Sequence, residues 1–206
     1  MPFTVIITIE HYVGGFMYKL CKTEQSTKRQ REIEKMFLLA LQTKLYDDIS
    51  VSYLCEISDI PRKAFYRYFD SKEDALRALI NHTLLEFEIF SQEYFKSDLR
   101  SVQRDLEIFF SFWKKNSDLL FAIERNDLSE ELTQCVCDFV WQDNMIVDKY
   151  FTGESLWMQI HIVKFALSGL IGFVLDWYKS NFEKDVLEMA LAAKRMLTTP
   201  LFSVDF

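Results

Sequence analysis

The chain has 206 residues, of which 50% are hydrophobic and 16% aromatic. This is enough for one large domain or two small ones with a sizeable buried core, and it excludes a disordered tail. Its 5 Gly and 3 Pro are well below the usual shares of roughly 7% and 5%, so long helices are expected. The net charge of −7 argues against a protein that coats nucleic acid without sequence preference.

Charge is unevenly distributed along the chain. Residues 19–80 hold 12 Lys or Arg against 10 Asp or Glu, a balance of +2. Residues 81–206 hold 12 against 20, a balance of −8. The basic part of the chain is therefore its N-terminal third.

Residues 1–26 are interpreted as an N-terminal extension. No Lys or Arg precedes the apolar start of the chain, so a secretory signal peptide is not expected. Met17 follows Gly14-Gly15, and the composition turns basic and helical from Lys19. Two interpretations stay equally open: a genuine extension, or a mis-assigned start with Met17 as the first residue.

Two helices and a turn are predicted next. An apolar stripe predicts an amphipathic helix from near Thr27 to near Lys44; its members are Ile33, Met36, Phe37, Ala40 and Leu41. After a polar break, Ser50 can cap a short helix that carries Val51, Leu54, Cys55 and Ile57. Ser58-Asp59-Ile60 then forms a turn.

A third short helix is predicted from Pro61 to Tyr68, because the fixed φ of proline suits the first turn of a helix. Ser71 and Asp74 then resemble a capping box at the start of a long fourth helix, whose apolar face holds Leu76, Leu79, Ile80, Thr83, Leu84 and Phe87. Two short helices joined by a tight turn and braced by a preceding helix form a helix-turn-helix unit. Its second helix is expected to enter the major groove of DNA.

The exposed side of that second helix is expected to be basic and aromatic. Arg62, Lys63 and Arg67 are donors for phosphates and base edges. Tyr66 and Tyr68 are interleaved with them. The alternative is that these charges only form a solvated helix face.

The remainder of the chain is also predicted to be helical. Four apolar stripes carry this prediction: Leu106, Phe109, Phe110 and Trp113; Leu132, Val136, Phe139 and Val140; Ile160, Val163, Leu167, Leu170, Ile171 and Val174; and Val186, Leu187, Ala190, Leu191 and Leu197. Glycine inside a helix costs up to about 1 kcal/mol relative to alanine, so Gly169 and Gly172 need a packing reason. We expect another helix to dock against them across a dimer axis. The alternative is a monomer core helix that tolerates both.

The four cysteines, Cys21, Cys55, Cys135 and Cys137, are too few and too irregularly spaced for a disulfide framework. We expect half-buried thiols in a reducing cytoplasm, with a redox sensor as the less favoured alternative and no metal site. The most apolar run, from Phe165 to Leu175, is shorter than the roughly 20 residues that span a bilayer. A membrane partner is therefore not expected.

The segment from Ile49 to Asp74 resembles the DNA-binding signature of the TetR (tetracycline repressor) family of bacterial transcription regulators. The strongest parts are Phe65-Tyr66-Arg67-Tyr68-Phe69 and Ser71-Lys72-Glu73, and the resemblance is specific over roughly residues 28–80. It implies an all-α fold. An N-terminal three-helix helix-turn-helix DNA-binding domain (27–73) would precede a C-terminal helical ligand-binding and dimerisation domain (74–206).

The resemblance also implies which residues contact DNA: Ser50, Ser52, Arg62, Lys63, Ala64, Tyr66, Arg67, Tyr68 and Lys72. Lys28, Arg29 and Arg31 could form a basic arm. The sequence departs from the family pattern in the turn, where Ser58-Asp59-Ile60-Pro61 stands in place of the usual Ala-Gly-Val-Ser. Asp tolerates a left-handed backbone better than most residues, and Pro61 replaces a Ser that often caps the recognition helix and touches phosphate.

The family plan further implies a ligand pocket and a dimer interface in the C-terminal domain. Ligand sites are mostly apolar with a few polar groups, so the candidate lining residues are aromatic with one histidine: Phe90, Tyr94, Phe109, Phe112, Trp113, Phe121, Trp141, Trp157 and His161. The alternative is that most of these side chains are core. The candidate dimer residues are Phe165, Gly169, Gly172, Phe173, Leu187 and Leu191.

These features lead to one functional expectation and two rivals. We expect a homodimeric repressor that binds a near-palindromic DNA operator, needs no cofactor, and is released when a small-molecule effector favours another spacing of its two DNA-reading heads. An enzyme is not favoured, because the chain has no glycine-rich phosphate loop, no His-Glu-x-x-His and no Gly-x-Ser-x-Gly. The other rival is a helical interaction protein with a degenerate helix-turn-helix that does not read DNA. A salt-sensitive DNA affinity distinguishes it from a true reader.

Overall fold

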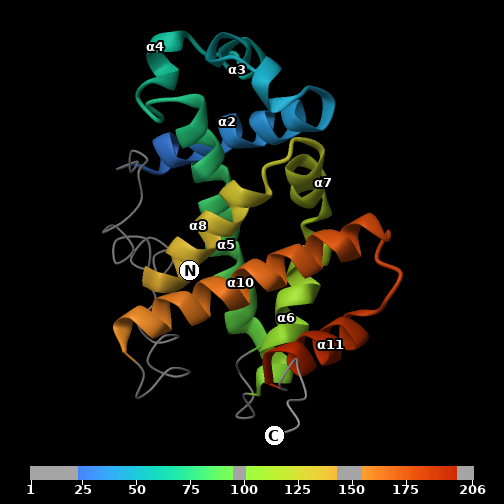
Figure 1. The fold of residues 1–206 in the computed structure, drawn as a ribbon. Coiled ribbons are helices and arrows are strands. Elements are labelled where there is room, and N and C mark those ends of the chain that lie inside the picture. Colours follow the sequence, from blue (N-terminus) through green and yellow to red (C-terminus); the bar gives the residue numbers. More distant parts are fainter. Residues whose placement is uncertain (1–22, 95–100, 143–154, 199–206) are drawn as a thin grey trace, which may run out of the picture.

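The computed structural model describes residues 23–94, 101–142 and 155–198, and every regular element in these ranges is a helix (Figure 1). In chain order the elements are α2 (Glu24–Thr43), the 3₁₀ turn η1 (Tyr46–Asp48), α3 (Val51–Ile57), α4 (Arg62–Phe65), α5 (Lys72–Tyr94), α6 (Val102–Lys115), α7 (Ser117–Arg125), α8 (Ser129–Gln142), α10 (Leu156–Lys179) and α11 (Val186–Thr198). The expectation of an all-α fold is confirmed.

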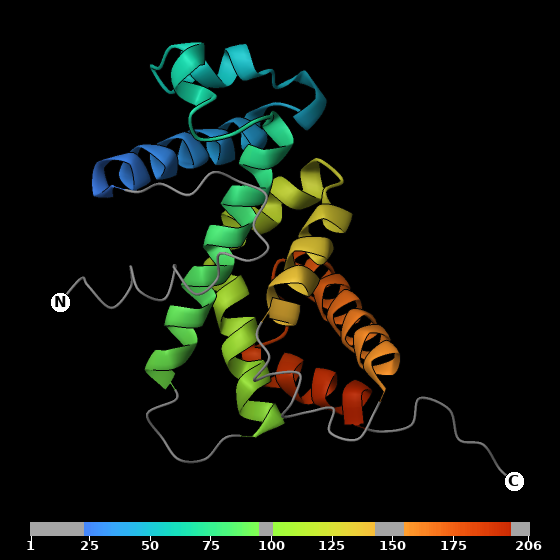
Figure 2. The same cartoon turned by 90° about the vertical axis from the view of Figure 1, so that its left-hand side faces the viewer.

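The helices form two groups that are joined by α5. At one end of the molecule α2, α3 and α4 lie together, and α5 starts among them and runs into the body (Figure 1 and Figure 2). In the body, α6 packs against α11, and α10 packs against α8 and α7. Both α5 and α7 contact α2. Two helices therefore connect the body with the end that carries α3 and α4.

The first helix, α2, begins earlier than its apolar stripe predicts. The Ser26 amide donates to the Thr23 hydroxyl (3.2 Å), and the Thr23 amide donates to the Ser26 hydroxyl (3.2 Å). This reciprocal capping box starts the helix at Glu24 rather than near Thr27. Ile33 is fully buried, as the stripe predicts.

The short helix α3 and the turn after it form as predicted. Ser50 caps the start of α3 with its side chain. After the helix, Asp59 has a left-handed φ of 49°. Its amide donates to the Glu56 carbonyl (3.1 Å), and the next amide, of Ile60, donates to the Cys55 carbonyl (3.0 Å). This is the Schellman cap, in which the left-handed residue is usually glycine, so aspartate keeps the tight turn that leads to α4.

The next helix, α4, is shorter than the predicted helix from Pro61 to Tyr68. Its α-helical part is Arg62–Phe65, and Pro61 precedes it as the N-cap with an extended ψ of 148°. Beyond the helix the chain tightens, since the Arg67 amide donates to the Ala64 carbonyl (3.2 Å). A bond over three residues is typical of a 3₁₀ turn, and it ends the α-helix early.

The long helix α5 starts at its predicted cap. The Ser71 hydroxyl accepts a hydrogen bond from the Asp74 amide (3.1 Å). The Asp74 carboxylate accepts one from the Asp70 amide (3.0 Å), so the return bond reaches one residue further back than a standard capping box. Along the 23 residues of α5, the predicted face is buried as far as Leu84 and half-buried at Phe87.

The apolar stripes do not predict α7, although they do predict α6, α8, α10 and α11. Asn116 both ends α6 and begins α7. Its backbone amide and its side-chain amide donate to the Phe112 carbonyl, at 3.0 and 2.9 Å. A side chain that bonds back to the preceding turn can end a helix without glycine or proline. The break therefore has no strong sequence signal.

One continuous hydrophobic core joins the two groups of helices. It runs from Ile33 and Phe37 in α2 through Leu76 in α5 to Leu120 in α7 and Trp177 in α10. The expected domain boundary between residues 73 and 74 falls in the first turn of α5. The division into two domains remains a prediction.

The helix α10 is longer than its apolar run. With 24 residues and a mean hydropathy of 1.7 over an 18-residue window, it is long and apolar enough to cross a membrane. This is weak evidence for a membrane segment, because core helices of soluble proteins pass the same test. Val163 and Val174 are buried, whereas Leu156 and Phe165 are 65% and 70% exposed. Within the described subunit, α10 therefore packs on one side only.

Candidate nucleic-acid interface

Most of the predicted DNA-contacting side chains are exposed at one end of the molecule. They lie on α3, α4 and the adjoining cap and turn: Ser50, Ser52, Arg62, Lys63, Tyr66 and Arg67. Three of these six carry positive charge. Figure 1 shows α3 and α4 at the end of the molecule opposite α11. A DNA duplex could therefore approach them without meeting the body.

Arg62 and Tyr66 form a pair on the outer face of α4. Arg62 Nη2 donates to the Tyr66 hydroxyl at 3.4 Å, and this hydrogen bond raises the pKa of Arg62. The Tyr66 ring stands edge-on to the buried Phe65 ring, with 5.6 Å between centroids. Phe65 thus anchors a tyrosine whose hydroxyl lies beside a guanidinium, and both groups can donate to one phosphate.

Two further candidates, Ala64 and Tyr68, do not lie on this outer face. Each is only 8% exposed. They are four residues apart, which places them on one side of a helical turn, and Phe65 on the same side is fully buried. The Tyr68 ring packs against Phe69 with 6.4 Å between centroids. These two side chains contribute to the core beneath α4 and also line a groove beside it, and their contact with DNA stays a prediction.

Lys72 is held against η1 rather than extended into solvent. Its Nζ donates to the Tyr46 carbonyl (2.8 Å) and lies 3.9 Å from the centroid of the Tyr46 ring. The Tyr46 hydroxyl donates to Glu73 (3.2 Å), and burial together with the Glu73 charge raises the pKa of Tyr46 well above its usual value. The start of α5 is therefore tied to η1, and a phosphate contact by Lys72 would use an N–H group that the Tyr46 carbonyl does not occupy.

The basic residues expected to form an arm belong to α2 itself. Lys28, Arg29 and Arg31 all lie inside this helix. Arg31 pairs with Glu34 of the same helix (3.2 Å) and with Glu86 of α5 (2.6 Å). The three residues thus lie on the first turns of α2, and their contact with DNA stays a prediction.

A groove of about 680 Å³ between the start of α2 and α4 is not predicted by the sequence. Its basic lining residues are Lys28, Arg29 and Arg67. The others are Thr23, Gln25, Ser26, Glu32, Ile60, Pro61, Ala64 and Tyr68. Since positive charge attracts the DNA backbone, this groove extends the candidate interface from α4 to the start of α2.

Several predicted pocket residues pack into an aromatic cluster between α5 and α6. Phe90 lies 5.6 Å from Phe112, and Phe109 lies 6.3 Å from Trp113, measured between ring centroids. Trp113 is 1% exposed. These side chains fill the core where the two helices meet, which is the alternative considered for them.

The remaining pocket candidates lie apart from this cluster. Phe121 in α7 and Trp141 in α8 are half-buried, and the side chain of Tyr94 lies outside the described residues. Trp157 and His161 stack on the surface of α10 with ring centroids 4.4 Å apart, and Trp157 is 63% exposed. Within the described residues, none of these candidates lines the three concave sites, which lie at α4, between α6 and α11, and between α10 and α11.

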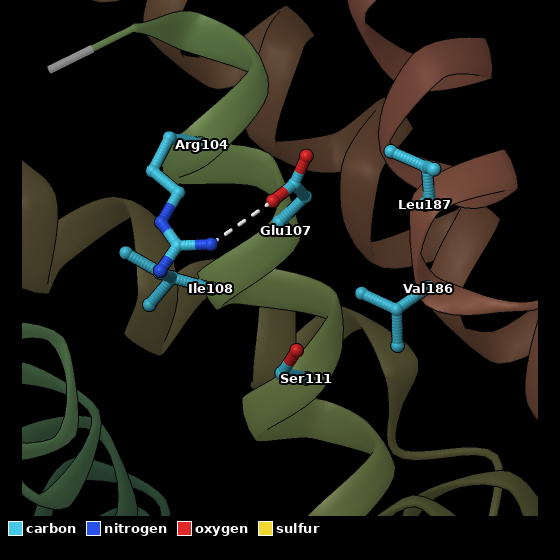
Figure 3. A pocket seen from close by; sticks show the side chains of 6 residues that line it. All are labelled: Arg104, Glu107, Ile108, Ser111, Val186 and Leu187. Carbon is cyan, nitrogen blue, oxygen red and sulfur yellow. Dashed lines mark hydrogen bonds and ion pairs between the residues drawn. The ribbon is translucent and has the colours of Figure 1, made fainter. Parts of the chain in front are cut away.

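A different concave site, of about 410 Å³, lies between α6 and α11 (Figure 3). It is lined by Arg104, Glu107, Ile108 and Ser111 of α6 and by Val186 and Leu187 of α11. Arg104 and Glu107 form an ion pair at 3.2 Å. No sequence motif points to this site, because its lining comes from two helices that are distant in the sequence.

Four of the six predicted dimer residues share one face of α10. Phe165, Gly169 and Phe173 line a shallow apolar groove of about 300 Å³ between α10 and α11, with Ala166, Ser168, Leu170, Ala193, Met196 and Leu197. Gly172 is three residues beyond Gly169 on the same face. A Cβ built at either glycine would meet no atom within 4 Å, so nothing in the subunit requires glycine there.

The other two dimer candidates, Leu187 and Leu191, are 48% and 46% exposed. They lie about half a turn around α11 from Met196, as the helical period of 3.6 residues requires, and Leu187 faces the concave site between α6 and α11. The structure therefore does not place them in the groove with Phe165.

The three described cysteine thiols are buried or half-buried. Burial raises the pKa of Cys55 and Cys137, and it raises that of Cys135 to about 12. Since the thiolate is the reactive form and the metal ligand, this chemistry does not favour a redox sensor. Cys21 lies outside the described residues. In the part of the chain that the structure describes, no group of three His, Cys, Asp or Glu gathers to hold a metal ion.

No family model matches the chain. It is 28% identical over 105 residues to the HTH-type dhaKLM operon transcriptional activator DhaS of Lactococcus lactis subsp. lactis (strain IL1403). The match covers 50% of this chain and 54% of DhaS, so it spans about half the length of that curated relative.

Solved structures of regulators share the helix arrangement over most of the chain. The fatty acid degradation regulator FadR from Bacillus halodurans has a TM-score of 0.61 at 14% identity, covering 88% of this chain and 98% of that protein. FadR from Bacillus subtilis in complex with stearoyl-CoA has a TM-score of 0.58 at 14% identity, with coverages of 82% and 97%. A tetR-family regulator from Streptomyces coelicolor has a TM-score of 0.50 at 15% identity, with coverages of 83% and 79%. These proteins are transcription regulators rather than enzymes, and at such low identity the likeness shows the fold alone.

Proposed function

We propose that this chain, which has the fold of TetR-family transcription regulators, is a dimeric DNA-binding regulator that works in the cytoplasm under the control of a small-molecule effector. The observation that carries the proposal is the exposed basic and aromatic face of α4, at one end of a chain whose net charge is −7. That face consists of Arg62, Lys63, Tyr66 and Arg67. Lys63 would reach base edges, and the Arg62–Tyr66 pair would bind phosphate.

The proposed dimer forms through the apolar face of α10. A partner subunit would cover Phe165 and bring its own helix against Gly169 and Gly172, where nothing in the subunit packs. Two copies of α4 about 34–36 Å apart would then reach successive major grooves of a near-palindromic duplex. An effector that favours another distance between the two copies would release the DNA.

The test of this function is a fluorescence-anisotropy titration of the full chain against duplexes tiled across the DNA that flanks its gene. We expect tight binding to one near-palindromic tile, with an affinity that falls steeply between two salt concentrations because phosphate contacts release counterions. Lys63→Ala should weaken this binding. The matched control is Lys184→Ala, which removes an exposed lysine next to α11. This variant should bind as tightly as the intact chain.

Weak binding that is equal on all tiles would contradict the proposal. It would favour the rival function, a helical interaction protein with a degenerate helix-turn-helix. The inward positions of Ala64 and Tyr68 and the Lys72–Tyr46 bond are the observations that keep this rival in the test.

We propose an apolar or amphipathic effector. Long-chain acyl-CoA thioesters are the first probes, because FadR from Bacillus subtilis, which has a similar fold, was solved in complex with stearoyl-CoA. The anisotropy of the protein–DNA complex should fall as stearoyl-CoA is added. Dihydroxyacetone is the second probe, chosen from the name of the dihydroxyacetone kinase operon activator DhaS, whose structure has a TM-score of 0.52 with this chain.

We propose repression as the mode of regulation, since a dimer that covers its operator blocks access to the promoter. DhaS is named an activator, so a reporter gene behind the bound duplex has two informative outcomes. Loss of expression in the presence of the protein supports repression, and a gain of expression replaces it with activation.

A further inference from the structure

Asn126, at the end of α7, connects three segments of the chain. Its side-chain amide donates to the Leu41 carbonyl in α2 (2.9 Å) and to the Ala122 carbonyl in α7 (2.7 Å). Its side-chain oxygen accepts a hydrogen bond from the Tyr46 amide in η1 (2.7 Å). Both N–H groups and one acceptor position of the asparagine are thus in use. No other amino acid of this size offers two donors and an acceptor in one plane.

The backbone around Asn126 fixes the direction of its side chain. Asp127 has a left-handed φ of 55°. Its amide donates to the Glu124 carbonyl (3.3 Å), and the Leu128 amide donates to the Ile123 carbonyl (3.0 Å). These two bonds form a Schellman cap, and Leu128 is 4% exposed. The asparagine is therefore held on both sides before it meets α2 and η1.

Tyr46 carries the connection on to the helices that would contact DNA. Its amide is bonded to Asn126, and its carbonyl accepts a hydrogen bond from Lys72 (2.8 Å). Its hydroxyl donates to Glu73 (3.2 Å). Lys72 and Glu73 open α5, only a few residues after α4. The body thus holds η1 from one side, and the start of α5 holds it from the other.

On its other side, α7 is tied to α10. Lys179, in the last turn of α10, pairs with Glu124 at 2.9 Å. Glu124 precedes Asn126 by two residues. At the end of α7, the Glu124 side chain is therefore bonded to α10. The Asn126 side chain is bonded to α2 and η1.

We propose that Asn126 is a positioning residue, which fixes the angle between the DNA-contacting helices and the body, and that α7 couples α10 to this angle along a route separate from α5. The proposal rests on the proposed function, because it assigns to Asn126 a role within a DNA-binding dimer. Without its hydrogen bonds to α2 and η1, only the apolar packing of α2 against α5 and α7 would orient the helix group, and the distance between two DNA-reading heads would vary more.

The first test needs no DNA and uses amide hydrogen exchange of the full chain. Asn126→Ala removes the acceptor of the Tyr46 amide, so this amide should exchange about tenfold faster. Asn126→Asp replaces both N–H donors by an oxygen that would face the Leu41 and Ala122 carbonyl oxygens, so it should also accelerate exchange at the Tyr46 amide. Asn116→Ala is the matched control, because Asn116 caps the other end of α7 and its side chain bonds to Phe112 only within that region. Unchanged exchange in Asn126→Ala, or equal acceleration in Asn116→Ala, would overturn the proposal.

The coupling to α10 is tested with the same amide. Lys179→Ala should accelerate exchange at Tyr46. Lys184→Ala, which removes an ion pair confined to the start of α11 (3.8 Å), should not. If the Tyr46 amide exchanges at the same rate in Lys179→Ala and Lys184→Ala, the proposed coupling between α10 and η1 is wrong.

The second test measures position directly, with duplexes whose two half-sites are moved by about one or two base pairs. The intact chain should lose affinity with each step, whereas Asn126→Ala should bind all spacings with more similar affinities. A loss of folded protein lowers binding to every duplex by the same factor, so the ratio between spacings isolates positioning. The same ratio in the intact chain and in Asn126→Ala would overturn the proposal. If no duplex binds at all, the proposed function fails, and the exchange at Tyr46 still decides whether Asn126 holds η1.

Discussion

Replacement of Gly172 by leucine is predicted to change subunit stability and dimerisation in opposite directions. In the subunit, a Cβ at Gly172 would meet no atom within 4 Å. A side chain therefore fits, and it removes the cost of glycine in a helix, about 1 kcal/mol. Between two copies of α10 that approach closely at this point, the same side chain has no room.

The magnitudes follow from the exposure of the α10 face. Phe165 is 70% exposed in the subunit, which is roughly 100–170 Å² of a side chain of this size. At about 25 cal/mol per Å², its burial by a partner contributes about 3–4 kcal/mol per copy. A leucine that separates the two helices removes this contact from both copies. Since only part of such an area converts to affinity, dimerisation should weaken by at least about a thousandfold.

The assay is sedimentation equilibrium over a concentration series, combined with denaturant unfolding at concentrations where the protein is monomeric. Gly172→Leu should be a monomer with a higher free energy of unfolding than the intact subunit. Gln134→Leu adds the same side chain to the exposed surface of α8 and should dimerise normally.

Two results would refute this reasoning. A Gly172→Leu dimer with an unchanged dissociation constant would mean that the helices do not approach at this glycine. A destabilised monomer would mean that the space beside Gly172 is not open in the subunit.

Lys63→Ala should weaken binding to a specific duplex by about 1–3 kcal/mol if Lys63 reads a base, measured by anisotropy; an unchanged affinity excludes that contact. Asp59→Gly should raise the free energy of unfolding by about 0.5–1 kcal/mol, because only glycine adopts the left-handed φ without cost; a lower melting temperature would contradict the Schellman geometry. Cys135, with its pKa raised to about 12, should resist iodoacetamide at mildly alkaline pH until the chain is unfolded, and rapid labelling of the folded chain would show an open site. A hydrogen bond from its own backbone amide lowers the pKa of Glu73 from 4.5, so its charge stabilises the fold above that pH and the contribution is lost as the pH falls through the lowered value. The stability difference between the intact chain and Glu73→Gln, from urea unfolding, should therefore vanish in acid, and a difference that persists there would have another cause.

The helices α3 and α4 and the turn between them could be predicted from sequence, because the residues that cap and turn the chain are close neighbours in the sequence. Ser50 caps α3 from the adjacent position, and Asp59 adopts the left-handed turn within four residues of its bonding partners. Asn126 shows the opposite case. Its bonding partners Tyr46 and Leu41 are 80 and 85 residues away, and nothing in its own neighbourhood distinguishes it from any helix-ending asparagine.

Residue type alone also does not decide which side chains face inward. Ala64 in α4 and Tyr68 in the turn after it match the family pattern as well as Arg62 does, yet they share the buried face of Phe65. The helix is only four residues long, too short for its apolar period to be read from sequence. The same limit applies to the aromatics, since Trp113 is core and Trp157 is surface, and only the packing of α6 and α10 separates them.

The four tryptophans give the chain a built-in optical reporter. Trp113 and Trp177 are 1% and 3% exposed and Trp141 is half-buried, whereas Trp157 is 63% exposed on α10. Indole emission shifts to shorter wavelength in apolar surroundings, and a dissolved quencher such as iodide reaches only exposed rings. Iodide should therefore quench Trp157 first, and anything that covers the start of α10 would protect it. The two internal indoles supply a constant background against which that change can be measured without any added label.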